Sequence, residues 1–294
     1  GVIAPALHTL IRPASALRNV GSMRIENDEQ IPTYRADMLN FTPRLWPVIS
    51  RRFGKIALRL FDQYAKREGQ PDVLHVHAAL PAGGAGLEIA VRHQIPYVLS
   101  EHSTALARGR VNPLGLDQMR TVFRRASASY AVSSPFARFL ENKLELDVGT
   151  VRVMPNSVND VFLGSEIECP AGDVFRFCHI SLLDEKKNVE GLIRAFASRF
   201  RNRETVSLVI GGDGPSRPAL QKLARECGVL GQVEFTGHLS RSQVRGVLAH
   251  SDVFVLPSHF ETFGVVLIEA TAMGVPVIAT RCGGPEDIVT GNNG

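Results

Sequence analysis

The sequence predicts an α/β fold made of two doubly wound, Rossmann-like domains. Short β-branched runs alternate with segments of helical periodicity, a pattern typical of parallel sheets covered by helices on both faces. The chain has 294 residues, which is enough for two domains with separate cores. A polar, irregular stretch at 156–172 interrupts the alternation and marks the expected boundary.

Strand-like and helical segments follow one another in order along the chain. Strands are predicted in the first half at Val73–Val76, Tyr97–Leu99, Ser129–Val132 and Val151–Met154. Strands are predicted in the second half at Phe177–Ile180, Ser207–Ile210, Val233–Phe235, Val253–Leu256 and Val275–Ala279. Helical periodicity is clear over Asn188–Phe200 and Pro218–Cys227. We therefore place the first domain at residues 1–160 and the second at residues 161–294.

Both ends of the sequence are expected to be truncated. The chain opens on the strand-like Val2–Ala4, without a preceding strand and glycine loop. It stops at 291–294, a turn that should lead into another strand. We expect the first domain to lack its first strand and the second domain to lack its C-terminal end.

The composition favours a cytoplasmic globular protein. Hydrophobic residues make up 44% of the sequence and charged residues 21%, ordinary values for such proteins. No window reaches the roughly 18 uninterrupted apolar residues of a membrane-spanning helix, and no secretory leader opens the chain. The four cysteines are scattered and form no C-x-x-C pair, so neither a metal site nor a disulfide framework is expected.

A basic segment in the first domain is a candidate for contact with an anionic surface. Seven basic residues and one acidic residue lie between Arg44 and Arg67. Residues 48–66 have apolar side chains at helical spacing, and a basic amphipathic helix can lie on an anionic bilayer. The favoured alternative is a surface helix whose apolar stripe packs on its own domain. Nucleic acid is not an expected partner, because no recognition motif accompanies the charge.

Two glutamates in the second domain are the strongest candidates for a binding site. Glu261 lies in the loop between the strand at 253–256 and a predicted helix at 263–273, and Glu269 lies further along that helix. Free amides at a helix start attract phosphate, and carboxylates accept hydrogen bonds from sugar hydroxyls. The alternative for either residue alone is a helix-capping or solvated glutamate.

A histidine ends one predicted strand of the first domain. His102 follows the strand at 97–99, and functional residues gather at the carboxyl ends of parallel strands. The alternative is a strand-end histidine bonded to the backbone. His75 and His77 are predicted to be core or supporting histidines on a buried strand, and the role of Glu101 is left open.

The longest motif resembles a known family. The segments Pro257–Ala270 and Gly274–Ala279, with seven residues between the two glutamates, resemble the nucleotide-sugar-binding signature of glycosyltransferase family 4. Gly211–Pro215 is similar to the glycine-rich turn of that family, Phe235–His238 to its base-contacting segment, and Val153–Val158 to the motif closing its first domain. The resemblance covers nearly all of residues 70–294.

The resemblance implies a GT-B fold, in which two Rossmann-like domains face a cleft that holds the active site. It implies an acceptor-binding first domain and a nucleotide-sugar-binding second domain. Catalytic roles are implied for His102, Glu261 and Lys187, the last neutralising the departing diphosphate. Donor-binding roles are implied for Ser181, Lys187, Gly212, Gly237, His238, Glu261, Phe263, Gly264 and Glu269.

One position departs from the family pattern. The family usually has an arginine five residues before the lysine, where this chain has Leu182. A guanidinium is a planar phosphate clamp with several donors, so its loss weakens the expected stabilisation of the leaving group. Lys186 and Ser181 are the candidate substitutes.

The implied activity is transfer of a sugar from a UDP- or GDP-linked donor to an acceptor hydroxyl, with retention of anomeric configuration. The expected acceptor is a sugar or lipid-linked sugar in bacterial polysaccharide or glycolipid synthesis, which would place the protein on the inner face of the membrane. No Asp-x-Asp motif ends a strand, so neither an obligatory metal nor a cofactor is expected. Two alternatives stay open: a sugar-nucleotide epimerase or hydrolase, and a nucleotide-sugar-binding subunit without catalysis.

Overall fold

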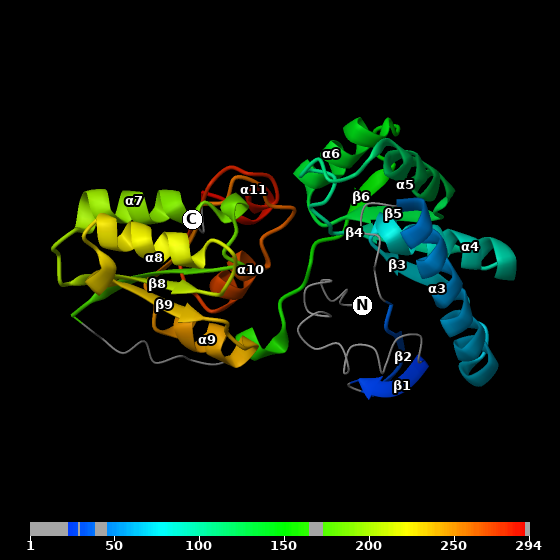
Figure 1. The fold of residues 1–294 in the computed structure, drawn as a ribbon, viewed down its shortest axis with the longest axis horizontal. Coiled ribbons are helices and arrows are strands. Elements are labelled where there is room, and N and C mark those ends of the chain that lie inside the picture. Colours follow the sequence, from blue (N-terminus) through cyan, green and yellow to red (C-terminus); the bar gives the residue numbers. More distant parts are fainter. Residues whose placement is uncertain (1–22, 29, 39–45, 165–172, 292–294) are drawn as a thin grey trace. The chain divides into compact units, whose positions relative to one another are not determined.

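The computed structural model describes residues 23–28, 30–38, 46–164 and 173–291. The chain divides into two compact units (Figure 1). One unit comprises Gly1–Ala131 and Ala137–Val153, and the other comprises Val132–Phe136 and Met154–Gly294. The predicted opening strand at Val2–Ala4 and most of the final turn lie outside the described residues. The predicted boundary between residues 160 and 161 stays a prediction.

The first unit is built on a parallel four-stranded sheet whose order is β3-β4-β5-β6. Its strands are β3 (Leu74–His77), β4 (Tyr97–Glu101), β5 (Ala128–Ala131) and β6 (Val151–Val153). The helices of this part of the chain are α3 (Trp46–Glu68), η1 (Ala79–Gly83), α4 (Gly84–His93), α5 (Pro113–Arg125) and α6 (Ser134–Leu144). Strands β1 (Met23–Asp28) and β2 (Ile31–Ala36) form a separate antiparallel hairpin.

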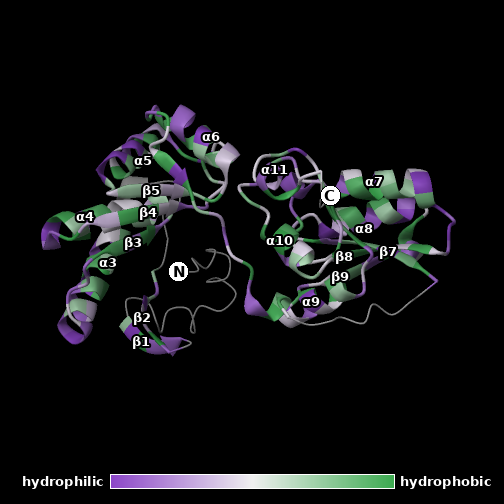
Figure 2. Ribbon diagram, turned by 180° about the vertical axis from the view of Figure 1, so that it is seen from behind, coloured by the Kyte–Doolittle hydropathy of each residue, from purple (hydrophilic) through white to green (hydrophobic). Residues whose placement is uncertain are grey.

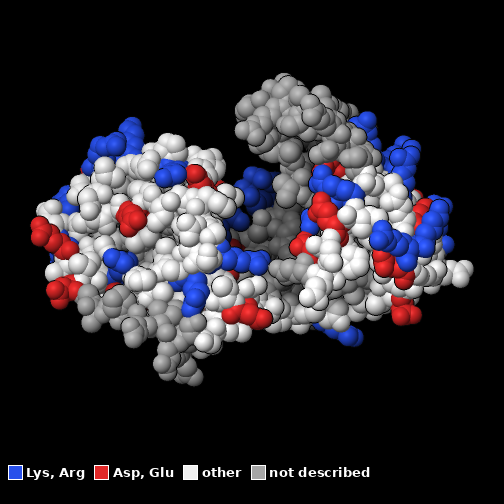
Figure 3. All heavy atoms as spheres, turned by 90° about the horizontal axis from the view of Figure 1, so that it is seen from below, with Lys and Arg blue, Asp and Glu red and all other residues white. Residues whose placement is uncertain are grey.

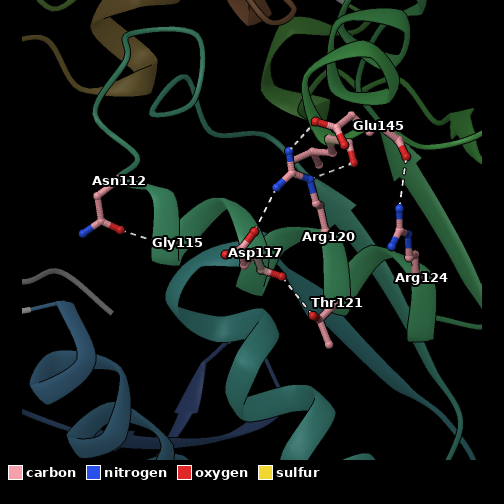
Figure 4. A network of polar contacts seen from close by, with 8 residues as sticks. Asn112, Gly115, Asp117, Arg120, Thr121, Arg124 and Glu145 are labelled. Atoms are coloured by element: carbon pink, nitrogen blue, oxygen red, sulfur yellow. Dashed lines mark hydrogen bonds and ion pairs between the residues drawn. The ribbon is translucent and has the colours of Figure 1, made fainter.

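Helix α5 shows how local sequence sets an element of this unit. Pro113 occupies its first turn, and the side chain of Asn112 accepts a hydrogen bond of 2.8 Å from the Gly115 amide. Figure 4 shows Arg120 of α5 reaching Glu145, which follows α6, with a nitrogen–oxygen distance of 2.7 Å. Arg120 also contacts Asp117 one turn earlier at 2.9 Å. These contacts join α5 to the end of α6.

The long basic helix packs on its own unit. Leu58 and Phe61 of α3 are buried in a cluster with Ile89 of α4 and Ile95. The favoured alternative from the sequence, in which the apolar stripe is covered by protein, is therefore confirmed for this part of the helix. Among the residues that the structure describes, no helix is long and apolar enough to cross a bilayer.

The second unit contains a parallel five-stranded sheet whose order is β11-β10-β7-β8-β9. Its strands are β7 (Phe175–Ile180), β8 (Val206–Gly211), β9 (Val233–Gly237), β10 (Val253–Leu256) and β11 (Val277–Ala279). Its α-helices are α7 (Val189–Phe200), α8 (Arg217–Glu226), α9 (Arg241–Ala249), α10 (Val265–Ala272) and α11 (Pro285–Ile288). The 3₁₀ helices are η2 (Asp160–Phe162), η3 (Glu185–Lys187) and η4 (Leu230–Gln232).

Two hydrophobic clusters cover this sheet. One contains Phe254 of β10 with residues of α9 and α10, such as Leu248 and Leu267. The other contains Leu208 of β8 with residues of α7 and α8, such as Ile193. Figure 2 shows that the helices carry hydrophobic and hydrophilic residues together, as helices with one covered side do. Helices on both faces of a parallel sheet confirm the predicted doubly wound architecture.

The strand order fixes where a ligand would bind. Along the chain the sheet starts at β7, grows outward through β8 and β9, and returns to the other side of β7 with β10. In doubly wound sheets the ligand site lies at this reversal, outside the carboxyl ends of the strands. The loops that follow β7 and β10 are therefore the expected site.

Candidate functional site

The two loops at the reversal carry an ion pair between predicted site residues. Lys187, which ends η3 after β7, binds Oε1 of Glu261, in the loop after β10. The lysine side chain is 14% exposed and the glutamate side chain 7%, so the pair is largely shielded from water. Removing one partner of such a pair would leave an uncompensated charge in the protein interior. The structure thus brings together two residues 74 positions apart in sequence.

The backbone around the ion pair is held on both sides. The Glu261 amide donates to the Cys282 carbonyl at 2.9 Å, and the Glu261 carbonyl accepts from the Gly284 amide at 2.9 Å. The His259 amide donates to the Lys186 carbonyl at 2.8 Å, which links the two loops directly. The Glu261 side chain therefore leaves a fixed backbone.

The helix entrance next to Glu261 is turned by a glycine. Gly264 caps α10 with φ of 101°, a left-handed conformation that glycine adopts readily. Phe263 before it is buried, and the helix starts at Val265, two residues later than predicted. Glu269 lies in the second turn and is half-buried, and burial raises the pKa of its carboxyl, with Arg241 opposing the shift. Glu269 is thus not simply a solvated glutamate.

Glycines let three loops of this edge approach closely. Gly212, after β8, has φ of 109° and donates its amide to the Gly237 carbonyl at 2.8 Å. A Cβ at Gly212 would lie 1.8 Å from the Ser181 carbonyl oxygen. Gly237 ends β9 with φ of 75°, and the next residue, His238, is exposed. Four predicted site residues (Ser181, Gly212, Gly237 and His238) therefore lie at or just after the ends of the adjoining strands β7, β8 and β9.

A buried histidine determines how Ser181 can bond. Nδ1 of His179 lies 2.8 Å from the Val255 carbonyl and its Nε2 lies 2.7 Å from the Ser181 hydroxyl. A carbonyl only accepts, so Nδ1 of the neutral ring carries the proton and Nε2 accepts a hydrogen bond from the Ser181 hydroxyl. Burial lowers the pKa of His179 to about 4, so the ring is neutral at pH 7. In this arrangement the Ser181 hydroxyl offers a ligand its lone pairs. Its role as a hydrogen-bond donor to the phosphate of the ligand stays a prediction.

Leu182 places no cation at this edge, and its side chain projects into solvent with 61% exposure. Arg217, in the first turn of α8, has a guanidinium nitrogen 3.4 Å from where a Cβ at Gly237 would lie. It also contacts Asp213 at 3.2 Å. Nothing in the sequence motif singled out this arginine.

In the first unit, His102 follows β4 and contacts a second histidine. Nε2 of His102 lies 3.0 Å from Nδ1 of His77, and the two rings stack with centroids 5.3 Å apart. The rings of His75 and His77 lie 4.1 Å apart. His75 and His77 are exposed, so of the two positions predicted for them the core is wrong, and the contact between His77 and His102 agrees with the supporting position. Partial burial of the ring, with smaller effects of the neighbouring His75 and His102 charges, lowers the pKa of His77.

Glu101, whose role the sequence left open, is a buried structural acceptor. Its carboxylate accepts from the Ala79 amide at 2.7 Å and from the Ser103 amide at 2.6 Å. Burial raises the pKa of this carboxyl, and the backbone hydrogen bonds oppose the shift. Glu101 therefore links the start of η1, which follows β3, to the loop after β4 that contains His102. Across the described residues, no group of three His, Cys, Asp or Glu side chains could hold a metal ion.

Two family models match consecutive parts of the chain. Glycosyltransferase Family 4 matches residues 26–162, and Glycosyl transferases group 1 matches residues 170–294. The chain belongs to glycosyltransferase family 4. This confirms the resemblance that the signature around Glu261 and Glu269 predicted.

Individual proteins that are similar to this family 4 chain are also named glycosyl-transferring enzymes. A glycogen synthase of Mycobacterium tuberculosis is 27% identical over 269 residues, which cover 89% of this chain. The match spans 64% of that relative, so the chain corresponds to under two thirds of its length. Sucrose-phosphate synthase from Thermosynechococcus elongatus has a similar structure, with a TM-score of 0.74, 21% identity, and coverage of 98% of this chain and 78% of that one.

A second solved structure is HepE of Anabaena in complex with UDP-glucose. Its TM-score is 0.64 at 20% identity, covering 80% of this chain and 65% of that chain. At such identities these structures establish the fold class of the family 4 chain, which is GT-B with two Rossmann-like domains.

Proposed function

We propose that this chain is a retaining glycosyltransferase that moves a sugar from a UDP- or GDP-linked donor to an acceptor hydroxyl. The observation that carries the proposal is the shielded pair of Lys187 and Glu261 at the reversal of a doubly wound sheet. A nucleotide sugar needs both charges there, because its diphosphate is anionic and its sugar presents hydroxyls. HepE, of the same fold, was solved with UDP-glucose, which supports this ligand class.

In this proposal the reaction breaks the bond between the anomeric carbon and the diphosphate oxygen. Lys187 and the amides before α10 stabilise the negative charge that develops on the departing diphosphate. Glu261 accepts hydrogen bonds from the donor sugar, and Glu269 accepts them from the ribose. The acceptor hydroxyl attacks an oxocarbenium-like centre on the face that the diphosphate leaves, and the departing oxygen takes the hydroxyl proton. His102 contacts the donor sugar during transfer. The positive charge that stabilises the departing diphosphate comes from the protein, without a metal or cofactor.

Glu261→Ala and His102→Ala are expected to lower transfer at least about 100-fold, the usual effect of losing one preorganised transition-state contact. Binding of bare UDP or GDP should weaken far less than transfer, because both side chains are assigned to the sugar. Nucleotide release from a donor panel, with and without sugar acceptors, measures transfer, and calorimetry measures nucleotide binding.

Glu204→Ala, which removes an exposed carboxylate of the same unit, is the matched control and should behave as wild type. Wild-type turnover in the Glu261 or His102 variant would contradict the catalytic role assigned to that residue. An epimerised donor after incubation without acceptor would favour an epimerase, and donor binding without any turnover would favour a non-catalytic binding subunit.

We further propose a cytoplasmic protein whose α3 rests on an anionic membrane that carries a lipid-linked acceptor. Arg52, Lys55 and Arg59 are exposed and spaced three and seven residues apart, which places them on one side of the helix. Within the described residues none of the three pairs with a carboxylate. Figure 3 shows basic side chains in blue over the right-hand unit, with acidic side chains between them. Because the apolar side of α3 packs on α4, this attachment would be electrostatic.

Replacing Arg52, Lys55 and Arg59 with Glu should weaken binding to phosphatidylglycerol vesicles at least about tenfold, because each basic residue near the membrane surface contributes about 1 kcal/mol to binding. Sedimentation with the vesicles measures this binding. The same reversal of the exposed Arg199, Arg201 and Arg203 in the second unit is the control. Equal sedimentation of wild type and the α3 variant would contradict membrane attachment through this helix.

A further inference from the structure

The carboxylate of Glu261 is bound unevenly. The Lys187 ammonium and the Ser258 hydroxyl both bind Oε1, and the hydroxyl donates at 2.8 Å. Within the described part of the chain, no hydrogen bond reaches Oε2. A carboxylate offers about four acceptor positions over two oxygens, so the protein engages one oxygen and leaves the acceptor positions of the other for a ligand.

Ser258 is itself fixed in place. It is 1% exposed, in the loop between β10 and α10. Its carbonyl accepts from the Thr280 hydroxyl at 2.5 Å, and the Thr280 amide donates to the Leu256 carbonyl at 3.1 Å. Thr280 directly follows β11, so the sheet holds the backbone of Ser258. A buried hydroxyl needs a partner, and that partner is Oε1 of Glu261.

The two donors on Oε1 set the orientation of the whole carboxylate. The terminal torsion of a glutamate side chain has a broad, shallow energy profile, so a single flexible contact would leave it free to rotate. Lys187 provides charge through a long side chain. Ser258 provides a short, buried hydroxyl on a fixed backbone, and such O–H···O⁻ hydrogen bonds are among the strong ones.

We propose that Ser258 is a positioning residue that, with Lys187, holds Oε1 of Glu261 so that Oε2 accepts from a hydroxyl of the donor sugar. The inference rests on the proposed function and adds the residue that sets sugar recognition apart from nucleotide recognition. Ser258 acts only through Glu261. It should therefore matter for the sugar of the donor and not for the nucleoside diphosphate.

The test is Ser258→Ala, measured by calorimetry with UDP-glucose, UDP-N-acetylglucosamine and GDP-mannose, and with bare UDP and GDP. For the donor that binds wild type, the preference over its bare diphosphate should fall about tenfold in Ser258→Ala, the usual effect of one charged hydrogen bond. The Kd of the bare diphosphate should change less than about twofold. In a Glu261→Gln background, Ser258→Ala should produce no further loss of preference, since the two residues act as one unit.

Two results would overturn the assignment: an unchanged preference, or a full additional loss in the Glu261→Gln background. An unchanged preference that comes from an equal loss for the donor and the bare diphosphate would mean that Ser258 only supports the loop. If wild type itself binds no sugar nucleotide of the panel, the proposed function fails as well. That outcome is distinct from a failure confined to Ser258.

Discussion

Lys187→Ala is expected to lower the free energy of unfolding by about 3 kcal/mol, the cost of leaving a buried charge without its partner. Glu261 would keep the Ser258 hydrogen bond but lose its counter-charge in a site where it is 7% exposed. Transfer should fall at least about 100-fold in the same variant, because the leaving diphosphate loses its cation. Urea unfolding measures the first effect and nucleotide release the second.

Two further variants separate the ion pair from a general effect of losing a lysine. Lys222 is 74% exposed and pairs with Glu226 at 3.6 Å, so Lys222→Ala should change stability by less than about 1 kcal/mol. Lys187→Met combined with Glu261→Gln should recover much of the lost stability, because neither buried charge remains, but no transfer. A Lys187→Ala protein as stable as wild type would show that the pair is not shielded as described.

Gly212→Ala is expected to destabilise the second unit by about 3 kcal/mol, at the upper end of the usual backbone-strain cost. The backbone of Gly212 has φ of 109°, a conformation that residues with a side chain rarely adopt. The added Cβ would also lie 1.8 Å from the Ser181 carbonyl oxygen, so the loops after β7 and β8 would have to separate. Because the loop after β7 leads to Lys187 and Gly212 is a predicted donor-binding residue, binding of UDP or GDP should weaken together with stability.

Gly231→Ala is the matched control for this prediction. Gly231 lies in η4, and its Cβ would meet no atom within 4 Å. Its substitution should leave nucleotide binding unchanged and alter stability by no more than about 1 kcal/mol. Thermal unfolding of both variants measures their stability, and calorimetric titration measures their nucleotide binding. Tight nucleotide binding by a stable Gly212→Ala protein would exclude the close approach of the two loops.

The sequence predicted the fold class and most elements because their signals are local. Alternating strand and helix periodicity needs no knowledge of strand order, and the strand at Val253–Leu256 was predicted with its observed bounds. The start of α10 was misplaced by two residues, because Gly264 takes a left-handed conformation and caps the helix. Whether a glycine turns the chain or continues a helix depends on tertiary contacts that the pattern does not contain.

The site was predicted only in part, since its contacts join distant segments. Glu261 and Lys187 were found through the family signature, but their pairing depends on β10 lying beside β7. His179 has no motif, and its neutral ring follows from burial. Ser258 stands inside the signature, but its role depends on which oxygen of Glu261 it binds. His77 was predicted to be a core or supporting histidine because it lies on a predicted strand, and its exposed side chain at the carboxyl end of β3 rules out the core.

Hydrogen–deuterium exchange with and without a sugar nucleotide tests the central claim most directly. The claim is that the carboxyl edge of the second sheet binds the donor through the loops that carry Lys187, Gly212 and Glu261. Peptides covering residues 181–188, 211–217 and 257–269 should gain protection with the donor that binds, whereas a peptide covering η4 should not. Binding of a sugar nucleotide without protection of these three segments would contradict the account.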